Sequence, residues 1–390
     1  MNKHPLSFFL GIATVFLLCP VSLSVNATDT PTLEQIQAFQ QFLLHQTNTL
    51  PDDSLYDWNQ DGAYTVVDLC LMKQAFHATA TGTIHTVSNS TELQQALKTV
   101  VAGDTILLQP GTYESSDYGE KAALFSSSQA GTATLPITIK SADPEHPAIL
   151  QGTEQQKGIV LYLTGDYWKV ENIKCSNAQK GIVLDHSNYS TIQQVEVFQT
   201  GEEGIHLRDG SSNCVIDHAT VHDTGLVNPT YGEGIYIGSA KSTTSYEHAC
   251  DNNLVTACTI SNTAAECIDI KEYTTGNCIQ NCTFYGGGMT ATDSFLDVKG
   301  NQTIVQNNYC DTQGNTAITD AFQVHCQVEG WGCDNTFSGN TASFSGTTEY
   351  LVRSWSGTSC TVQNNIRIPE SNTKYRAYSG STMTILEDTP

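Results

Sequence analysis

The feature of this sequence that most constrains its fold is a five-residue phrase that occurs seven times between Gly181 and Trp355. Positions two and four of the phrase are almost always Ile, Leu, Val or Phe, whereas positions three and five are mostly polar. Such an alternation indicates a β-strand with one buried face. The copies begin at Gly181, Gly204, Gly234, Cys267, Phe295, Ala321 and Leu351.

The spacing of the copies indicates how these strands are arranged. They recur at roughly 23 to 33 residues, which is typical of repeat proteins whose units stack. One strand per repeat, Asn- and Gly-rich turns and the lack of a helical pattern between copies predict an all-β fold, a right-handed parallel β-helix over residues 84–390. Because stacked coils lie about 4.8 Å apart, positions three and five should form two outward-facing columns of side chains.

Composition narrows the partners of such a protein. The 390 residues allow one large domain and a small one, and they include 40 acidic against 17 basic side chains. This balance argues against nucleic acid or an anionic membrane as a partner, and it is compatible with calcium binding. The 13 cysteines lack a metal-binding spacing. We expect Cys258, Cys282 and Cys310 to stack inside successive coils, with a Cys326–Cys333 disulfide as an alternative in an exported protein.

The N-terminus has the pattern of a secretory signal. Residues 1–27 combine a basic start, a short apolar run and the small-residue sequence Val25-Asn26-Ala27. The apolar run is too short to span a bilayer well, and no other segment is apolar enough to do so. We therefore expect a secreted, extracellular protein, without a membrane partner, that acts as a monomer.

Residues 32–78 form a separate small module. A first helix is predicted from one apolar face, and a second helix is predicted over Val67–Phe76. Between them, Gly62 occupies position 6 of a twelve-residue loop with oxygen ligands at positions 1, 3, 5 and 12, the pattern of a calcium site. The face of the first helix is Leu33, Ile36, Phe39, Leu43 and Leu44, and the four ligands are Asp57, Asn59, Asp61 and Asp68.

Asp at position 12 and the following Asp-Leu-Cys-Leu-Met-Lys make this module resemble the dockerin modules of cellulosomal enzymes. A dockerin has two such loops, and here residues 46–53 lack the ligand pattern in the place of the first. The resemblance implies a cohesin-bearing scaffoldin as partner and association with a cellulosome.

The predicted β-helix begins after a linker at residues 79–83. A helix over Glu92–Val101, capped by Asn89, should cover the first coil, which would otherwise expose core and a strand edge. The helix, Gly-Asp-Thr-Ile and Pro-Gly-Thr-Tyr resemble the entry of pectin-lyase-like β-helix proteins. Long connections at residues 224–232, 240–252 and 286–293 should wall a binding groove. After Asn372 the repeat fades, and we expect a C-terminal cover.

The predicted columns concentrate acids beside bases. The column before each strand is Glu203, Glu233, Glu266, Ser294, Asp320 and Tyr350; column three is His206, Tyr236, Asp269, Asp297, Gln323 and Arg353; column five is Arg208, Gly238, Lys271, Lys299, His325 and Trp355. Such columns indicate either an ion-pair network, Asp269 with Lys271 and Asp297 with Lys299, or a carbohydrate site.

Elimination from a uronic-acid polymer would need these residue types. A base must remove the carbon-5 proton while a cation neutralises the carboxylate. Lys271 is the candidate base, because neighbouring Lys299 and burial would lower its pKa, although Asp269 acts in the opposite direction. Gly238 would leave room for a sugar above Lys271. The candidate catalytic residues are Lys271, Lys299, Asp269, Asp297, His325 and Arg208; Tyr236, Asp320, Arg353 and Trp355 would bind substrate, and Glu233 and Glu266 would bind Ca²⁺.

Residues 232–238, 265–271 and 276–277 resemble the alginate lyase and chondroitinase B group of polysaccharide lyases. In that group a Glu five residues before a Lys binds calcium and the Lys is the base, which implies these roles for Glu266 and Lys271. Lys299 stands where the group has Arg, and Ala264 stands where it has a second Glu.

Two other functions fit the same columns. A glycoside hydrolase could use Asp269, Asp297 and Asp320, whose one- and two-coil separations bracket the distances of retaining and inverting enzymes. A non-catalytic solenoid could bind sugars on Tyr236, Trp331 and Trp355. The dockerin-like module favours an acidic plant cell-wall polysaccharide, pectin rather than alginate or chondroitin, as the polymer.

Overall fold

The computed structural model describes residues 31–50, 55–58, 62–79 and 82–386. The chain divides into two compact units, and the boundary lies between Thr81 and Gly82. None of the described helices is long and apolar enough to cross a membrane. The signal-peptide prediction falls on residues outside the described part of the chain.

The first unit contains two helices, α1 (Leu33–Leu43) and α2 (Val66–Thr79). Thr32 caps α1 in a capping box with Gln35. The core of the unit consists of buried apolar side chains from both helices and the segment between them: Ile36, Phe39, Tyr56, Leu69 and Met72. Leu44 was placed in this face from the sequence, but α1 ends at Leu43 and Leu44 is 59% exposed.

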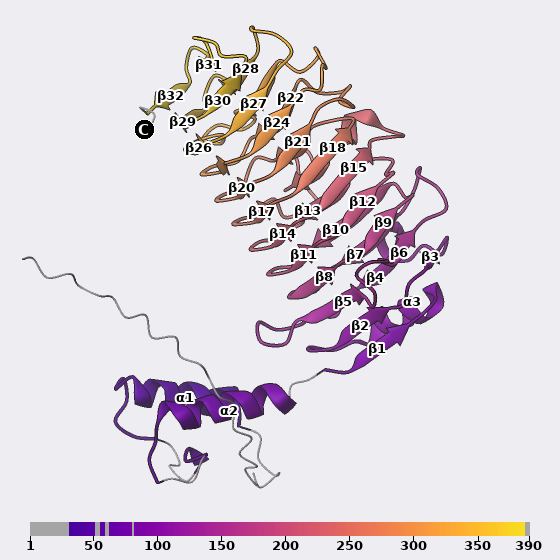
Figure 1. Ribbon diagram of the computed structural model, residues 1–390, viewed down its shortest axis with the longest axis vertical. Coiled ribbons are helices and arrows are strands. Elements are labelled where there is room, and N and C mark those ends of the chain that lie inside the picture. Colours follow the sequence, from indigo (N-terminus) through magenta and orange to yellow (C-terminus); the bar gives the residue numbers. More distant parts are fainter. Residues whose placement is uncertain (1–30, 51–54, 59–61, 80–81, 387–390) are drawn as a thin grey trace, which may run out of the picture. The chain divides into compact units, whose positions relative to one another are not determined.

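The second unit is a right-handed parallel β-helix, as the repeats predict. All strand pairs among its described residues are parallel, and the strands stack in three sheets along the coil axis, from β1 to β32 (Figure 1). Sheet 1 has twelve strands: β1 (Ile84–Val87), β2 (Thr105–Leu108), β5 (Ile137–Ser141), β8 (Trp168–Glu171), β11 (Thr191–Gln193), β14 (Val215–Asp217), β17 (Leu254–Thr256), β20 (Cys278–Gln280), β23 (Ile304–Gln306), β26 (Asn335–Ser338), β29 (Ser359–Gln363) and β32 (Thr382–Ile385).

The other two sheets have ten strands each. Sheet 2 contains β4 (Ala123–Ser127), β7 (Ile159–Leu163), β10 (Lys180–Asp185), β13 (Ile205–Arg208), β16 (Ile235–Ile237), β19 (Ile268–Ile270), β22 (Ser294–Val298), β25 (Asp320–Val324), β28 (Tyr350–Ser354) and β31 (Tyr375–Ala377). Sheet 3 contains β3 (Thr112–Glu114), β6 (Ile149–Gln151), β9 (Lys174–Ser176), β12 (Glu196–Phe198), β15 (Thr220–Thr224), β18 (Thr259–Thr263), β21 (Thr283–Tyr285), β24 (Tyr309–Asp311), β27 (Thr341–Ser343) and β30 (Ile366–Ile368). The seven repeated phrases are strands β10 to β28 of sheet 2.

Each coil contributes aliphatic and aromatic side chains to one continuous core. The three cysteines predicted to stack are buried free thiols. Cys310 does not share their column, however, because it lies opposite Phe284, two residues beyond the position that Cys282 occupies in its own coil. Cys326 and Cys333 are also free, so the alternative disulfide is absent from this structure.

The corner between sheets 1 and 3 has a recurrent left-handed residue. Asn281, Asn307 and Asn364 adopt positive φ there, and Asn tolerates that conformation better than most residues. One residue further on, Asn308, Asn340 and Asn365 form a buried ladder in which each amide donates to the next carbonyl oxygen at 3.0 Å. The turns thereby satisfy their polar groups inside the stack.

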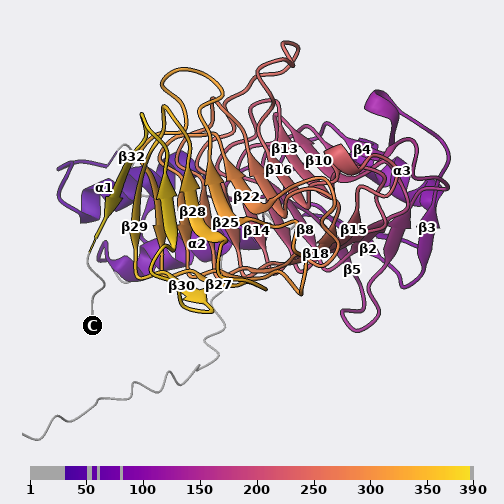
Figure 2. The same ribbon diagram turned by 90° about the horizontal axis from the view of Figure 1, so that it is seen from above.

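The two ends of the stack differ. Helix α3 (Ser90–Thr99) covers the first coil with Leu93, Ala96 and Leu97, and Asn89 caps it as predicted. The helix begins at Ser90, two residues before the predicted start at Glu92. At the other end, where the repeat was expected to fade after Asn372 into a cover, β31 and β32 continue sheets 2 and 1 in register. Between coils, long connections rise from the strands (Figure 2), and they include the short 3-10 turns η2 (Glu120–Ala122) and η3 (Pro229–Tyr231).

Candidate active site

Sheet 2 aligns the predicted columns across successive coils. His206 lies opposite Tyr236, Tyr236 opposite Asp269, and Asp269 opposite Asp297. Gln323 and Arg353 continue this row on β25 and β28. Column five continues the same ladder, since the amides of Lys271 and Lys299 donate to Ile237 and Ile270 of the preceding coils at 2.9 and 2.8 Å.

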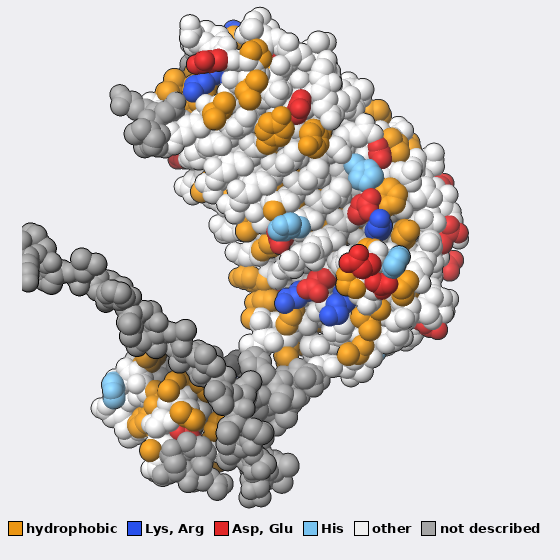
Figure 3. Space-filling view, viewed as in Figure 1, with side chains coloured by type: hydrophobic (Ala, Val, Ile, Leu, Met, Phe, Trp, Pro, Cys, Tyr) orange, Lys and Arg blue, Asp and Glu red, His pale blue; other side chains and the backbone are white. Residues whose placement is uncertain are grey.

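The columns face outward but are largely covered by their own neighbours. Asp269 is 3% exposed and Lys299 is 8% exposed, because long side chains one coil apart pack against each other. On the face that Figure 3 draws, the charged side chains gather in a few clusters. Sheet 3 also carries a charged pair, Lys174 with Glu196 at 2.6 Å, but each of these side chains is about a third exposed, so the columns of sheet 2 differ in being buried.

Asp269 is the centre of an ion-pair network. Its two carboxylate oxygens lie 2.6 Å from Lys271 Nζ and 2.5 Å from Lys299 Nζ. Lys299 also lies 3.3 Å from Asp297, whose carboxylate accepts a hydrogen bond from the Ser294 hydroxyl at 2.8 Å. Both predicted pairs are present, and the pair between Lys299 and Asp269 joins neighbouring coils.

The network raises the pKa of Lys271, whereas neighbouring cations and burial were expected to lower it. Burial does favour the neutral amine, but the charge of Asp269 and its hydrogen bond to Lys271 outweigh this, with a further contribution from Glu233. Burial would also raise the pKa of Asp269, but the charges of Lys299 and Lys271 hold it at about 2. Lys271 is thus a protonated ammonium as long as the Asp269 carboxylate stays paired with it and binds no other cation.

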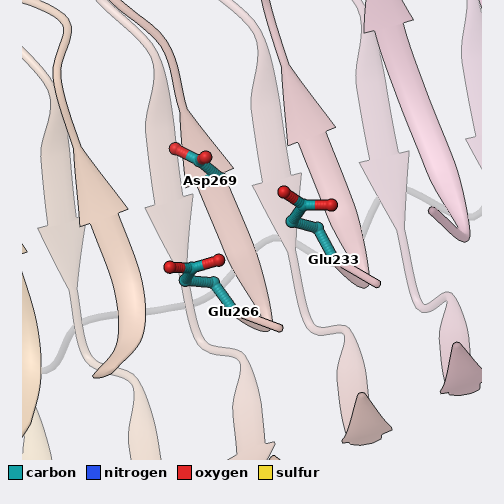
Figure 4. A group of neighbouring side chains, drawn as sticks. All are labelled: Glu233, Glu266 and Asp269. Carbon is teal, nitrogen blue, oxygen red and sulfur yellow. The ribbon is translucent and has the colours of Figure 1, made fainter. Parts of the chain in front are cut away.

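Three carboxylates converge beside this pair. Glu266 and Asp269 lie on the coil of β19 and Glu233 on the preceding coil, and the three turn toward one another (Figure 4), each with an oxygen within 4.8 Å of the others. Burial, followed by repulsion from Asp269, raises the pKa of Glu233 to about 9. Burial, followed by repulsion from Asp297, raises the pKa of Glu266 to about 7.

This cluster fits a divalent cation. Glu233 Oε2 is buried without a hydrogen-bond partner in the part of the chain that the structure describes, which is costly unless another group compensates it. Glu266 accepts one hydrogen bond, from the Thr292 hydroxyl at 2.8 Å. Oxygen-only ligands suit Ca²⁺. The two predicted ligands are therefore joined by Asp269, which the sequence analysis assigned to catalysis.

Tyr236 also lines a cavity of about 260 Å³. Two of the predicted connections wall it, through Tyr231 and Tyr246 respectively. The Lys271 ammonium lies 4.8 Å from the centre of the Tyr236 ring. The remaining lining includes Lys180, Glu203, His206, Arg208 and Ser239.

Two expectations about this region were wrong. Gly238 does not leave room above Lys271, because a β-carbon at Gly238 would lie only 2.7 Å from the Thr274 methyl and 3.1 Å from Lys271 Cβ. Arg208 was a catalytic candidate in the same column as Lys271, but it turns to the preceding coil and pairs with both oxygens of Asp185, at 2.7 and 2.8 Å. Arg208 therefore belongs to the cavity wall.

The substrate-binding candidates toward the C-terminus are only partly accessible. Asp320 is fully buried, 2.9 Å from Arg353, and accepts a hydrogen bond from Gln323 at 2.7 Å. His325 bonds the Gln323 amide at 2.8 Å and stacks on Trp355 with ring centres 5.5 Å apart. These residues continue the columns two and three coils beyond Lys271. Trp331, from the binding-protein alternative, packs edge-on against Tyr273, at 5.4 Å.

Sequence reasoning missed four residues, two in the cavity wall and two in the last coil of sheet 2. Tyr231 and Tyr246 lie in connections that carry no repeat. Arg376 on β31 continues column three, and Tyr378, directly after β31, continues column five. Their spacing held the signal, since 376 − 353 and 378 − 355 both equal 23, the same interval as between the first two phrases.

The predicted calcium loop of the first unit is described in part. Asn59 and Asp61 lie outside the described residues. Gly62 has φ of +79°, and its amide donates to Asp57 at 2.9 Å. Buried Asp68 accepts from the amides of Trp58 and Thr65, each at 2.9 Å, so positions 1 and 12 close the loop.

The fold and the charged columns define a right-handed parallel β-helix protein with a polar site on one sheet. Within that class, residues 73–303 match the family model described as "Pel9A-like, right handed beta helix region", and the chain belongs to this family. No curated protein matches the chain.

Three solved structures are informative. The chain is 39% identical to an alginate lyase from Paenibacillus sp. str. FPU-7, over 77% of this chain and 99% of that one, with a TM-score of 0.72. It is 16% identical to pectate lyase Pel9A over 80% of each chain, with a TM-score of 0.52. It is 12% identical to a DFA-IIIase mutant from Arthrobacter chlorophenolicus A6 over 78% of this chain and 81% of that one, with a TM-score of 0.53. The last two likenesses concern the fold alone.

Proposed function

We propose that this protein is a polysaccharide lyase that cleaves a uronic-acid polymer by β-elimination. The observation that carries the proposal is the contact of Lys271 with a carboxylate cluster able to hold a cation, beside a cavity walled by tyrosines. The alginate lyase that is 39% identical over most of both chains supports the same reaction class. Of the hydrolase candidates, Asp320 is fully buried and Asp269 and Asp297 are paired with lysines.

In this reaction Lys271 takes the carbon-5 proton of the sugar. The electron pair of that C–H bond forms the C4–C5 double bond, and the C4–O4 bond breaks. The departing oxygen needs a proton. Tyr236, whose ring centre lies 4.8 Å from the Lys271 ammonium, would donate its phenolic proton. Burial and the charge of Asp269 raise the pKa of Tyr236 and make it a weaker acid, but the departing alkoxide is basic enough to take the proton.

For Lys271 to act as a base, Asp269 must no longer hold it protonated. Glu233, Glu266 and Asp269 would be the calcium ligands. When bound, the ion would supply the positive charge that neutralises the substrate carboxylate and offsets that of Asp269. Lys299 lies one coil beyond Lys271, 3.3 Å from Asp297 of its own coil, and adds a second positive charge near the substrate carboxylate.

The polymer is proposed from two lines of support. The dockerin-like loop favours an acidic plant cell-wall polysaccharide such as pectin, whereas the relative with 39% identity acts on alginate. We infer that alginate is the first substrate to test, because that likeness covers the β-helix that carries the site. Polygalacturonate is the second.

An absorbance screen tests the proposal. Purified protein is incubated with alginate, polygalacturonate and chondroitin sulfate, with calcium or a chelator, and ultraviolet absorbance and reducing ends are both recorded. A lyase produces both signals, because the new double bond is conjugated with the carboxylate. Reducing ends without absorbance would indicate a hydrolase, and neither signal with retained binding would indicate a binding protein.

We also propose that the first unit binds one Ca²⁺ through Asp57, Asn59, Asp61 and Asp68. The hydrogen bonds that close its loop support this proposal. The resemblance to dockerins extends it to a cohesin-bearing scaffoldin as partner, and the N-terminal sequence extends it to export and cellulosome association. A pull-down with cohesin domains, with Asp57→Ala as the negative control, tests the partner.

A further inference from the structure

An aromatic and cationic surface continues the site toward the C-terminal end of sheet 2. It consists of Tyr350, Arg353, Trp355, Arg376 and Tyr378, and we call it the distal surface. Arg353 and Arg376 lie opposite each other on β28 and β31. Trp355 and Tyr378 stack with ring centres 4.5 Å apart and planes at 9°.

The two arginines of the distal surface differ in their partners. Arg353 is compensated by Asp320 at 2.9 Å. Arg376 is exposed and has no ion pair with any residue that the structure describes. Its guanidinium is nevertheless held in place, because it donates to the Tyr350 hydroxyl at 3.1 Å and lies 4.6 Å from the centre of the Tyr378 ring. A positioned and unpaired guanidinium is suited to a carboxylate.

The chemistry of the distal surface matches one class of ligand. Aromatic faces pack against the apolar face of a sugar ring, and arginine recognises its carboxylate. The chain has 40 acidic against 17 basic residues, so two adjacent arginines are a local exception that would attract an anion. A neutral polysaccharide would use the aromatic rings but not Arg376.

The position of the distal surface relates it to the proposed reaction. Columns three and five run without a break from Asp269 and Lys271 to Arg376 and Tyr378. With coils about 4.8 Å apart, Trp355 lies roughly 14 Å and Tyr378 roughly 19 Å from Lys271 along the stack. A polymer lying along the columns would thus reach the distal surface several sugar units away from the bond that is cleaved.

We propose that the distal surface is a remote subsite that binds a uronate unit of the same polymer, with Arg376 on its carboxylate and Tyr378 against its ring. This inference rests on the proposed function and deepens it, because it makes long acidic polysaccharide chains, rather than short oligosaccharides, the preferred substrate.

The test compares Arg376→Ala and Tyr378→Ala with Lys169→Ala, which removes one exposed charge from sheet 1. Each change is made in a Lys271→Ala background, so that the polymer stays intact, and binding is measured by affinity electrophoresis in gels containing alginate, polygalacturonate or a neutral glucan. We expect Arg376→Ala to weaken binding of the acidic polymers roughly tenfold, and added salt to reduce the difference. Lys169→Ala should bind as the parent does.

Arg376→Ala is also made in the protein that retains Lys271, and cleavage is measured. There it should raise KM for the polymer by a similar factor. Unchanged binding and KM in Arg376→Ala, while cleavage occurs, would overturn the subsite and leave the lyase proposal standing. Arg376-dependent binding without cleavage of any polymer would support the acidic-sugar subsite and overturn the lyase. An equal loss for the neutral glucan would contradict carboxylate recognition.

Discussion

At the scale of single residues, the column positions follow from the sequence but the pairing of their side chains does not. Alternation places Asp269 and Lys271 on the same strand face, and the register places Lys299 one coil away. That Lys299 reaches back to Asp269 as well as to Asp297 depends on side-chain packing across coils. The same packing decides the net direction of the Lys271 pKa shift, which the opposing effects of Lys299, burial and Asp269 left open in the sequence.

Asp320 gives a prediction about pH. Burial raises its pKa from 3.8 to about 7 despite the opposing charge of Arg353. The folded protein therefore binds one more proton than the unfolded chain between these values, so this group's stabilising contribution is present below pH 4 and is lost as pH rises through 7. Asp320→Asn cannot titrate and should remove that loss.

The measurement is the melting temperature of wild type and Asp320→Asn from pH 4 to pH 8, with exposed Asp117→Asn as the control. We expect wild type to lose a few degrees relative to Asp320→Asn as the pH rises. A constant difference between the two melting curves across that range would show that Asp320 titrates as it does in the unfolded chain.

At the scale of elements, the strands of sheet 2 were predictable because nearly every copy of the phrase alternates apolar and polar residues. The last coil was not predicted, since Tyr375-Arg376-Ala377 lacks the aliphatic pair of the earlier copies. The connections that wall the cavity were predicted, but the lining residues Tyr231 and Tyr246 could not be derived, because connections of irregular length carry no repeat. Helix α3 was found from its cap and its buried face, and both are local features.

The helix–loop–helix element of the first unit gives a prediction about calcium. If Asp57 and the acidic cluster of sheet 2 hold separate ions, calorimetric titration of the full chain should show two equivalents. Asp57→Ala should remove one, because its carboxylate closes the loop at Gly62, and Glu233→Gln should remove the other. An unchanged count in Asp57→Ala would contradict a site in the first unit.

At the scale of the whole molecule, the repeat period predicted the architecture, because only a stack of such units buries their apolar faces. The substrate is less accessible to sequence reasoning. The preference for pectin came from the association of a dockerin-like module with plant polymers, whereas the site itself offers only carboxylate recognition. The 39% identical alginate lyase changes the order in which polymers should be tested.

The most direct test of the account is the initial rate of ultraviolet absorbance on alginate and polygalacturonate for wild type, Lys271→Ala and Lys271→Arg. The account predicts that Lys271→Ala loses at least about a thousandfold in turnover with an unchanged circular dichroism spectrum. Lys271→Arg should not recover the rate, because a guanidinium stays protonated. If Lys271→Ala keeps most of the wild-type rate while Asp297→Asn or Asp320→Asn abolishes it, Lys271 is not the base and the lyase mechanism is wrong.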